Sequence, residues 1–273
     1  MRLAVAALAA ALLWAAPPQA ATLQLDGNFV QGGLVQGRTD PGARLALDGR
    51  TVRVGDDGRF VFGFGRDHGP DAVLAVQRPD GTTERQALKI GARTWDIQRI
   101  DGLPPKMVTP DPQVIERIKR ENAAIAEVRS HDTPRPWFET GFVWPALGPI
   151  SGIFGSQRIL NGEPRQPHFG IDIAAPAGSP VVASTDGQVV LAEPDLYFTG
   201  GTIILDHGFG LTAAYSHMQK LLVKVGDRVK QGQPIGLVGA TGRVTAAHLD
   251  FRVNWFDQRL DPQLLLPPMP AKE

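Results

Sequence analysis

Short runs of alternating apolar and polar residues fill the first third of the chain. They include residues 45–47, 52–54, 60–62 and 73–76, and a period of two residues predicts half-buried β-strands. Asp-Gly pairs at 26–27, 48–49, 57–58 and 80–81 separate or border these runs. This dipeptide favours tight hairpins because both residues tolerate positive φ. We therefore predict a small β-sandwich over residues 22–92.

The next segment, residues 93–136, is rich in proline and contains one proline-free stretch. Asp111 and Pro112 suit the cap and first position of a helix, and apolar residues such as Ile115, Ile118 and Val128 follow at roughly helical spacing. This predicts a helix at about 112–129 within a linker. We favour a helix that lies on a neighbouring domain, and the alternative is a docking helix or a lid over an active site.

Residues 137–267 return to short apolar runs between glycines, without a long helical period. Residues 223–236 place apolar side chains between glycine turns, which is typical of a strongly bent hairpin. The pattern predicts a second, mostly antiparallel β domain.

The first 21 residues have the pattern of a secretory signal peptide. Met1 and Arg2 precede an uncharged apolar stretch at 3–16, and small residues follow at 18–21. We expect an exported protein of the periplasm or cell envelope, and the alternative is an uncleaved N-terminal anchor.

The amino-acid composition limits the kinds of partner that can be expected. Lys plus Arg and Asp plus Glu both total 28, and no basic block suits nucleic acid phosphates, so nucleic acid is not an expected partner. The chain has no cysteine, so stability must come from apolar burial, from a metal or from both. The sequence does not indicate an oligomeric state.

Four of the six histidines lie in the second half of the chain, and two of them have an aspartate close by. An even spacing keeps His168 and Asp172, and likewise His248 and Asp250, on one face of an extended strand. Each pair alone is weak evidence for a metal site. We interpret His207 as a turn residue beside the site, and His68 as a solvated loop residue.

The combination of motifs resembles the lysostaphin/LytM-type zinc metalloendopeptidases, which are peptidoglycan hydrolases. The motifs are H-x-x-x-D at 168–172, Tyr-Ser-His at 215–217, Gly-Ala-Thr-Gly-Arg at 239–243 and His-Leu-Asp-Phe at 248–251. The resemblance covers residues from about 137 to 266. It implies a mainly β protein with a C-terminal LytM-type antiparallel β peptidase domain, preceded by the linker helix and by a sandwich that loosely resembles immunoglobulin-like modules.

The resemblance also implies roles for individual residues. His168 and Asp172 would bind Zn²⁺, and His217 and His248 would be unligated catalytic histidines facing the substrate. The chain departs from the family at the third ligand, where the second histidine of H-L-H is Asp250. Zinc accepts carboxylate oxygen, so Asp250 is our third candidate ligand, and a second carboxylate favours lower activity or another divalent metal such as manganese. The alternative is a metal-free site in which Asp250 accepts a hydrogen bond from His248 or Arg252.

The implied function is hydrolysis of peptide cross-links in peptidoglycan by metal-activated water. We expect His248 to take a proton from water, and His217 to donate a hydrogen bond to the oxyanion or protonate the leaving amine. Peptidoglycan stem peptides are the expected substrate partners, with Tyr197 as a candidate contact in the loop 195–201. Other cell-wall enzymes are further candidate partners.

Two alternative functions are also compatible with these sequence motifs. A non-catalytic relative would keep the fold and bind cell wall or activate another hydrolase. A biotinyl- or lipoyl-type carrier would share the stretch 223–236, but its modified lysine belongs at a hairpin tip that Lys220, Lys224 and Lys230 do not match.

Overall fold

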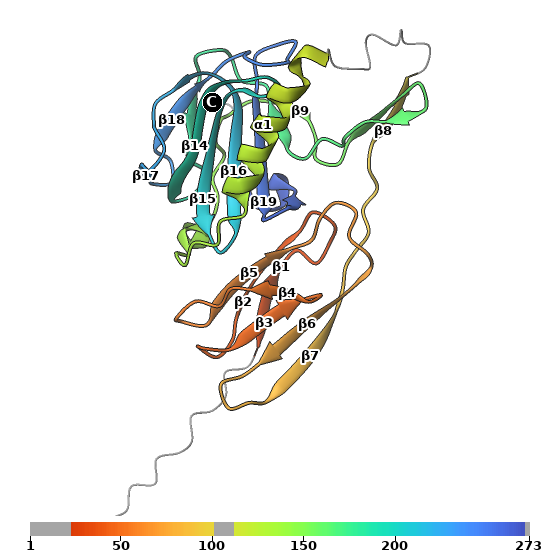
Figure 1. Ribbon diagram of the computed structural model, residues 1–273, viewed down its shortest axis with the longest axis vertical. Coiled ribbons are helices and arrows are strands. Elements are labelled where there is room, and N and C mark those ends of the chain that lie inside the picture. The colour runs from red at the N-terminus through yellow and green to blue at the C-terminus, as the bar shows by residue number, and fades with distance from the viewer. Residues whose placement is uncertain (1–22, 101–111, 271–273) are drawn as a thin grey trace, which may run out of the picture.

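The computed structural model describes residues 23–100 and 112–270, and it is mainly β, as predicted (Figure 1). The predicted signal peptide lies outside the described residues. Two antiparallel sheets, β1-β2-β5 and β4-β3-β6-β7, make up the N-terminal part. Their strands are β1 (Gln24–Gly27), β2 (Leu34–Arg38), β3 (Arg44–Leu47), β4 (Arg50–Val52), β5 (Arg59–Gly63), β6 (Asp71–Gln77) and β7 (Thr83–Lys89).

Alternation along these strands builds the N-terminal core. In β6 the even-numbered residues Ala72, Leu74 and Val76 are buried while their neighbours are more exposed, as a period of two requires. They share one buried cluster with Phe60 and Phe62 of the other sheet. The immunoglobulin-like character of this domain and the domain boundaries stay predictions.

Three of the four Asp-Gly pairs form turns. Asp48 and Gly49 join β3 to β4 with φ of 47° and 85°. The pair at 26–27 was predicted wrongly, since it ends β1, where Gly27 faces Val35 of β2. A Cβ on Gly27 would lie 2.3 Å from the backbone oxygen of Leu34, so the glycine permits close strand contact there.

The segment after the sandwich contains a strand that the sequence did not predict. β8 (Ile97–Ile100) pairs in parallel with β10 (Gln157–Leu160), and β11 (Glu163–Pro164) completes this small sheet. Its partner lies some sixty residues away, so local patterning in the linker could not reveal the pairing.

Helix α1 (Pro112–Arg129) follows and lies on the C-terminal sheet (Figure 1). Its Ile125 and Val128 pack against a buried apolar cluster of the sheet, made of Leu191, Leu196, Ile204 and Ala214. This contact supports the interpretation of a helix resting on a domain. The expected cap, Asp111, lies outside the described residues.

The C-terminal half is one large antiparallel sheet in the order β17-β14-β15-β16-β19-β12-β9, with β13, β18 and β20 paired beside it. Its strands are β9 (Ile150–Gly152), β12 (Ile171–Ile173), β13 (Pro180–Val182), β14 (Gly187–Leu196), β15 (Gly200–Gly208), β16 (Leu211–Leu221), β17 (Arg228–Val229), β18 (Pro234–Val238), β19 (Leu249–Trp255) and β20 (Gln258–Leu260). Two short 3-10 helices, η2 (Trp137–Thr140) and η3 (Pro262–Leu264), flank it.

The two faces of this sheet differ in chemistry. On β19, Phe251 and Val253 point into the main core. Asp250 and Arg252 are opposite Ser216 and Ala214 of β16, and directly paired residues share a face. Because Ala214 packs under α1, the polar side chains of β19 lie on the face that carries the helix.

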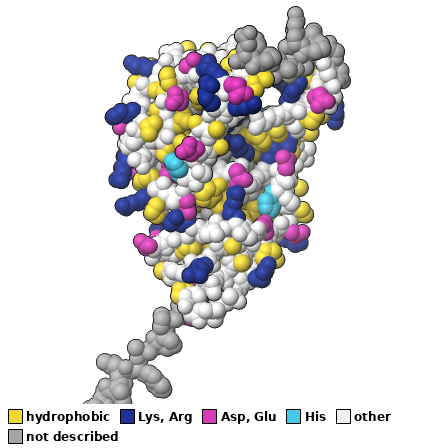
Figure 2. All heavy atoms as spheres, viewed as in Figure 1, with side chains coloured by type: hydrophobic (Ala, Val, Ile, Leu, Met, Phe, Trp, Pro, Cys, Tyr) yellow, Lys and Arg dark blue, Asp and Glu magenta, His cyan; other side chains and the backbone are white. Residues whose placement is uncertain are grey.

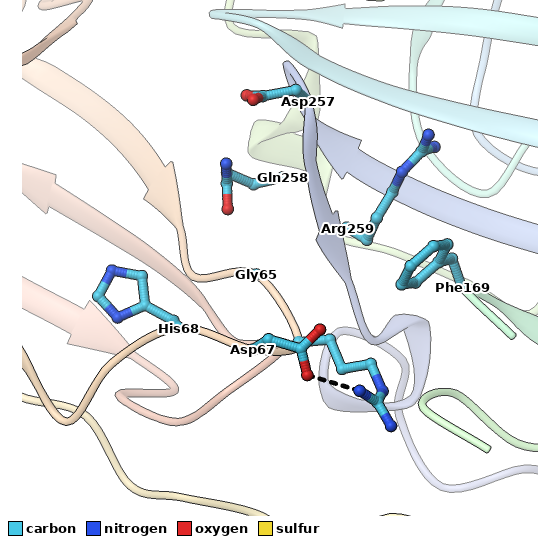
Figure 3. Close-up of a pocket in the computed structure, with 8 residues that line it drawn as sticks. Gly65, Asp67, His68, Phe169, Asp257, Gln258 and Arg259 are labelled. Atoms are coloured by element: carbon cyan, nitrogen blue, oxygen red, sulfur yellow. Dashed lines mark hydrogen bonds and ion pairs between the residues drawn. The ribbon is translucent and has the colours of Figure 1, made fainter. Parts of the chain in front are cut away.

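The N-terminal and C-terminal halves share one cluster of buried apolar residues, and polar groups also join them. Arg93 pairs with Asp261 at 2.8 Å, and Arg53 pairs with Asp132 at 2.7 Å. A cavity of about 290 Å³ lies between the two halves and is lined by His68 and Phe169 among others. Figure 3 shows the residues that line it.

His68 is less solvated than expected. Its ring packs edge-on against Phe64 at 5.0 Å, and Nε2 lies 3.5 Å from the Asp48 carboxylate. It thus contributes to packing within the N-terminal domain.

The molecular surface is mixed in charge. On the face shown in Figure 2, Lys and Arg side chains are interspersed with Asp and Glu. Among the described residues, no helix is both long and apolar enough to cross a bilayer.

Candidate metal centre

His168, Asp172 and Asp250 come together although they are distant in sequence. One ligand atom from each lies within 4.8 Å of the others. His168 Nε2 is 3.1 Å from Asp172 Oδ1 and 3.9 Å from Asp250 Oδ1. The strand register explains the meeting, because Asp172 of β12 pairs directly with Asp250 of β19. The Asp250 carboxyl therefore faces the other two groups.

His217 and His248 border the same cluster. Their ring centroids are 4.8 Å apart, His248 Nε2 lies 3.6 Å from Asp172 Oδ1, and His217 Nε2 lies 4.0 Å from Asp250 Oδ2. The sequence thus identified five side chains that the fold gathers at one place.

The backbone of His217 is strained in a way that aims its ring. Its φ is 67°, which non-glycine residues rarely adopt. The β15–β16 register shifts between Gly201↔Met218 and Ile203↔Tyr215, so a β-bulge lies at this position. Bulges redirect side chains near active sites, and the strain here is consistent with a functional role.

Backbone carbonyls fix the tautomers of all three histidines. The Nδ1 atoms of His168, His217 and His248 lie 3.3, 2.9 and 2.9 Å from carbonyl oxygens of Ile153, Thr241 and Ala246. A carbonyl only accepts, so each neutral ring carries its proton on Nδ1. In the neutral rings of His217 and His248 the lone pair at Nε2 is therefore directed towards the cluster, as a general base requires. Nε2 of His168 carries a proton while it donates to Asp172, and it becomes available as a metal ligand when that proton is lost.

Two glycines leave room for the carboxylates. A Cβ on Gly152 would lie 2.2 Å from Asp172 Oδ2, and one on Gly170 would lie 3.0 Å from Asp250 Oδ1. Gly170 lies within the H-x-x-x-D motif. Gly152 was not foreseen, because its strand β9 meets β12 only in the tertiary structure.

Asp250 is buried and paired with Arg252. Arg252 donates from Nε at 2.9 Å to Oδ1 and from Nη2 at 2.5 Å to Oδ2. Burial disfavours the charged form of Asp250, but the Arg252 charge and hydrogen bonds outweigh it and lower its pKa to about 2. The carboxylate is ionised at neutral pH.

The pKa values of His168 and His217 shift in opposite directions. Burial lowers the pKa of His168, but the hydrogen bond to Asp172 and the charges of both aspartates outweigh it, so the pKa rises overall. Burial lowers the pKa of His217, which the Thr241 carbonyl and Asp250 offset only in part. His217 is consequently a neutral acceptor at its Nε2 at neutral pH.

These donors fit a divalent cation. Tetrahedral zinc with bonds of about 2.0 to 2.2 Å separates its ligand atoms by roughly 3.4 Å, close to the spacing in this cluster. Each carboxylate oxygen has two lone pairs, so Asp250 Oδ1 can accept from Arg252 and still face a cation. Arg252 also offsets one of the two carboxylate charges, leaving the donor set with the net charge of a site that has a single carboxylate.

Tyr197, the predicted substrate contact, interacts with its own loop and with α1. The Tyr197 ring contacts Phe198 at 4.9 Å and lies 6.0 Å from the Arg117 guanidinium of α1, while its backbone N–H donates to Glu121 at 2.8 Å. The adjacent Thr199 carbonyl accepts from the His217 backbone N–H. A substrate contact for Tyr197 stays a prediction.

The interpretation of His207 was wrong. It lies within β15 rather than in a turn, is fully buried, and its Nδ1 lies 2.7 Å from the Asp186 backbone oxygen. Asp206 pairs with Thr212, whereas Ser216 pairs with Asp250, so His207 is at the end of the sheet away from the cluster. Its apolar neighbours in the sequence, which continue a buried run, were the signal for this position.

The C-terminal half of the chain resembles known proteins. Residues 166–262 match peptidase family M23. Over 105 residues the chain is 45% identical to peptidoglycan DD-endopeptidase ShyA of Vibrio cholerae. The aligned region is 38% of this chain and 24% of ShyA. It is 38% identical over 120 residues to the murein hydrolase activator EnvC of Escherichia coli, over 44% of this chain and 27% of EnvC.

A solved structure extends the likeness beyond that domain. The crystal structure of a Pseudomonas aeruginosa protein assigned to peptidase M23 matches with a TM-score of 0.68 and 28% identity, over 86% of this chain and 94% of that chain. Several curated relatives are longer, and the chain spans between 20% and 40% of their length.

Proposed function

Because residues 166–262 form a peptidase family M23 domain, we propose that this protein is a zinc-dependent endopeptidase that hydrolyses peptide cross-links of bacterial peptidoglycan. The observation that carries the proposal is the convergence of His168, Asp172 and Asp250 beside two further histidines whose Nε2 atoms face the carboxylates. The name of the relative ShyA supports the substrate class.

In this proposal His168 Nε2, Asp172 and Asp250 hold the zinc ion. When bound, zinc supplies Lewis-acid chemistry, which makes a water more acidic and polarises the scissile carbonyl. Arg252 orients Asp250 through its two nitrogen donors and keeps it ionised.

His248 takes the proton of the attacking water at Nε2, which its Nδ1 contact with the Ala246 carbonyl leaves unprotonated. His217 has the same tautomer and a lowered pKa, so it first accepts a proton before it can donate to the oxyanion or the leaving amine. The ring centroids of His217 and His248 are 4.8 Å apart, so the two rings are in contact beside the cluster. This refines the expectation that His217 acts as a donor from the start.

A second candidate function follows from the Asp250–Arg252 pair and from the activator EnvC. If the ion pair takes the place of the third metal bond, the domain would bind peptidoglycan or activate another cell-wall enzyme without cutting. In both cases the site faces the cell wall, and we place the protein in the periplasm or cell envelope.

Metal content and product release distinguish the two functions. We expect one zinc per purified chain and release of fragments from peptidoglycan, with manganese as a second metal to assay. His168→Ala and His248→Ala should both abolish release, but only His168→Ala should lose the zinc. His131→Ala, an exposed histidine outside the cluster, is the matched control. Absence of both zinc and fragment release from the unaltered protein would refute the enzyme and leave the binding function.

A further inference from the structure

A second polar site lies beside the candidate metal centre. A cavity of about 740 Å³ opens between α1, the β19–β20 turn and the N-terminal domain. We call it the arginine pocket, and its lining includes Arg50, Asn122, Arg129, Gln166 and Arg259.

The carboxylates at the pocket already have cationic partners. Asp257 pairs with Arg50, and Asp132 pairs with Arg53 at 2.7 Å. Each is already engaged in an ion pair, although the charge of Asp257 also acts on Arg259.

Arg129 and Arg259 remain without a carboxylate. Across residues 23–100 and 112–270 no ion pair includes either side chain, and the buried Nε of Arg129 has no hydrogen-bond partner. Burial lowers the pKa of Arg129 to about 9, and the nearby charges of Arg259 and Arg252 act in the same direction, while the charge of Asp250 opposes them in part. Burial and Arg252 likewise lower the pKa of Arg259 to about 10. The pocket thus concentrates positive charge that Asp250 and Asp257 balance only in part.

Strand geometry connects the pocket to the metal centre. Asp250, Arg252 and Asn254 alternate along β19 on one face, and Arg259 of β20 pairs with Asn254. At 3.3 Å per residue, Asn254 lies about 13 Å along β19 from Asp250. The Asn254 amide is oriented so that its nitrogen donates to the Val253 carbonyl and its oxygen accepts from Arg259 Nη1 at 2.8 Å. The other donors of the Arg259 guanidinium are left free.

The segment carrying His168 also borders the pocket. Gln166 lines it, two residues before His168. The Arg259 guanidinium lies 5.5 Å from the ring of Phe169. Figure 3 shows this guanidinium directed away from Asp67 and His68 of the smaller cavity. A peptide lying across the metal centre would therefore have the arginine pocket within reach of its extended chain.

We propose that the arginine pocket binds a carboxylate of the peptide substrate through Arg129 and Arg259, about four extended residues from the bond that is cut. Guanidinium groups bind carboxylates through paired hydrogen bonds, and the amides of Asn122 and Gln166 supply further donors. This inference rests on the proposed function and adds a requirement for an acidic substrate.

Binding of two matched peptides tests the proposal. The probes are a synthetic stem peptide without a cross-link and with free carboxyl groups, and the same peptide with every carboxyl group amidated. Calorimetric titration of the full chain should show that the acidic peptide binds roughly tenfold or more tightly than the amide. Arg129→Gln should remove most of this difference. Arg120→Gln, an exposed arginine of the same helix, should retain it.

A stability measurement separates binding from a structural role. The buried Nε of Arg129 has no hydrogen-bond partner, and such a group disfavours folding, so Arg129→Gln should leave the melting temperature unchanged or raise it. A lowered melting temperature together with unchanged peptide selectivity would assign Arg129 to the fold and overturn the proposal.

The outcomes also separate this inference from the proposed function. Equal affinity for the acidic and amidated peptides, or binding of inorganic phosphate without selectivity between them, overturns the carboxylate pocket even if peptidoglycan is cut. Selective binding of the acidic peptide without fragment release refutes the peptidase alone and supports the pocket.

Discussion

Replacing Arg252 by glutamine probes whether Asp250 belongs to the metal centre. The pKa of Asp250 is about 2 instead of 3.8, and this difference corresponds to about 2 kcal/mol of stability at neutral pH. Removing the arginine costs more, because it leaves a carboxylate that is only 2% exposed without a cation. We expect the metal-free Arg252→Gln variant to lose about 3 kcal/mol or more of its unfolding free energy at pH 7.

The pH dependence has a defined sign. A carboxyl group with a lowered folded-state pKa stabilises the protein above its unfolded pKa, and this contribution is lost as the pH falls towards about 2. The difference in unfolding free energy between the wild type and Arg252→Gln should therefore be largest at neutral pH and decrease below about pH 4.

Zinc makes the measurement specific. A cation bound to Asp250 replaces part of the missing arginine charge, so saturating zinc should raise the unfolding free energy of the variant more than that of the wild type. The assay is urea unfolding followed by Trp fluorescence, once with a chelator and once with zinc. Lys89→Gln, which breaks the exposed pair with Asp71, should change stability by less than about 1 kcal/mol and leave the zinc effect unaltered. Equal stabilisation of wild type and Arg252→Gln by zinc would refute Asp250 as a ligand.

Two further substitutions test the packing and the buried histidine. Gly152→Ala should displace Asp172, because the added Cβ would lie 2.2 Å from the carboxylate, and should weaken zinc binding roughly tenfold or more, measured in competition with a chelator. The control is Gly69→Ala, which has open space around it. Equal zinc affinities of the two variants would exclude the steric argument. Burial lowers the pKa of His207 to about 4 from 6.5. The neutral ring therefore contributes fully to stability above pH 6.5, and about 3 kcal/mol of the unfolding free energy is lost as the pH falls to 4. His207→Asn retains a donor for the Asp186 carbonyl and should flatten this dependence in urea unfolding between pH 7 and 4, and an unchanged slope would contradict the assignment to His207.

Local patterns alone determined much of the architecture. Alternation of apolar residues predicted mainly β structure, and the prolines with helical spacing between them were enough to predict a helix before the second domain. Turn chemistry located the β3–β4 hairpin, since Asp48 and Gly49 both adopt positive φ. These features depend on contiguous residues, so a sequence contains the information directly.

The candidate site was also readable in part. The spacing of His168 and Asp172, and the motif around His248, selected the residues whose atoms meet in the cluster. The role of Arg252 entered only as an alternative partner of Asp250, and the structure shows that this pairing and a contact with the cluster coexist.

Only the tertiary structure decided which distant groups share an environment. The parallel β8–β10 pair, the burial of His207 and the gathering of Arg129 and Arg259 at one cavity all depend on strands and a helix separated in sequence. Strand register, burial and uncompensated charge arise from contacts between remote segments. Hydrophobic alternation fixes which side of a strand is apolar, but it does not specify the neighbour against which that strand will pair.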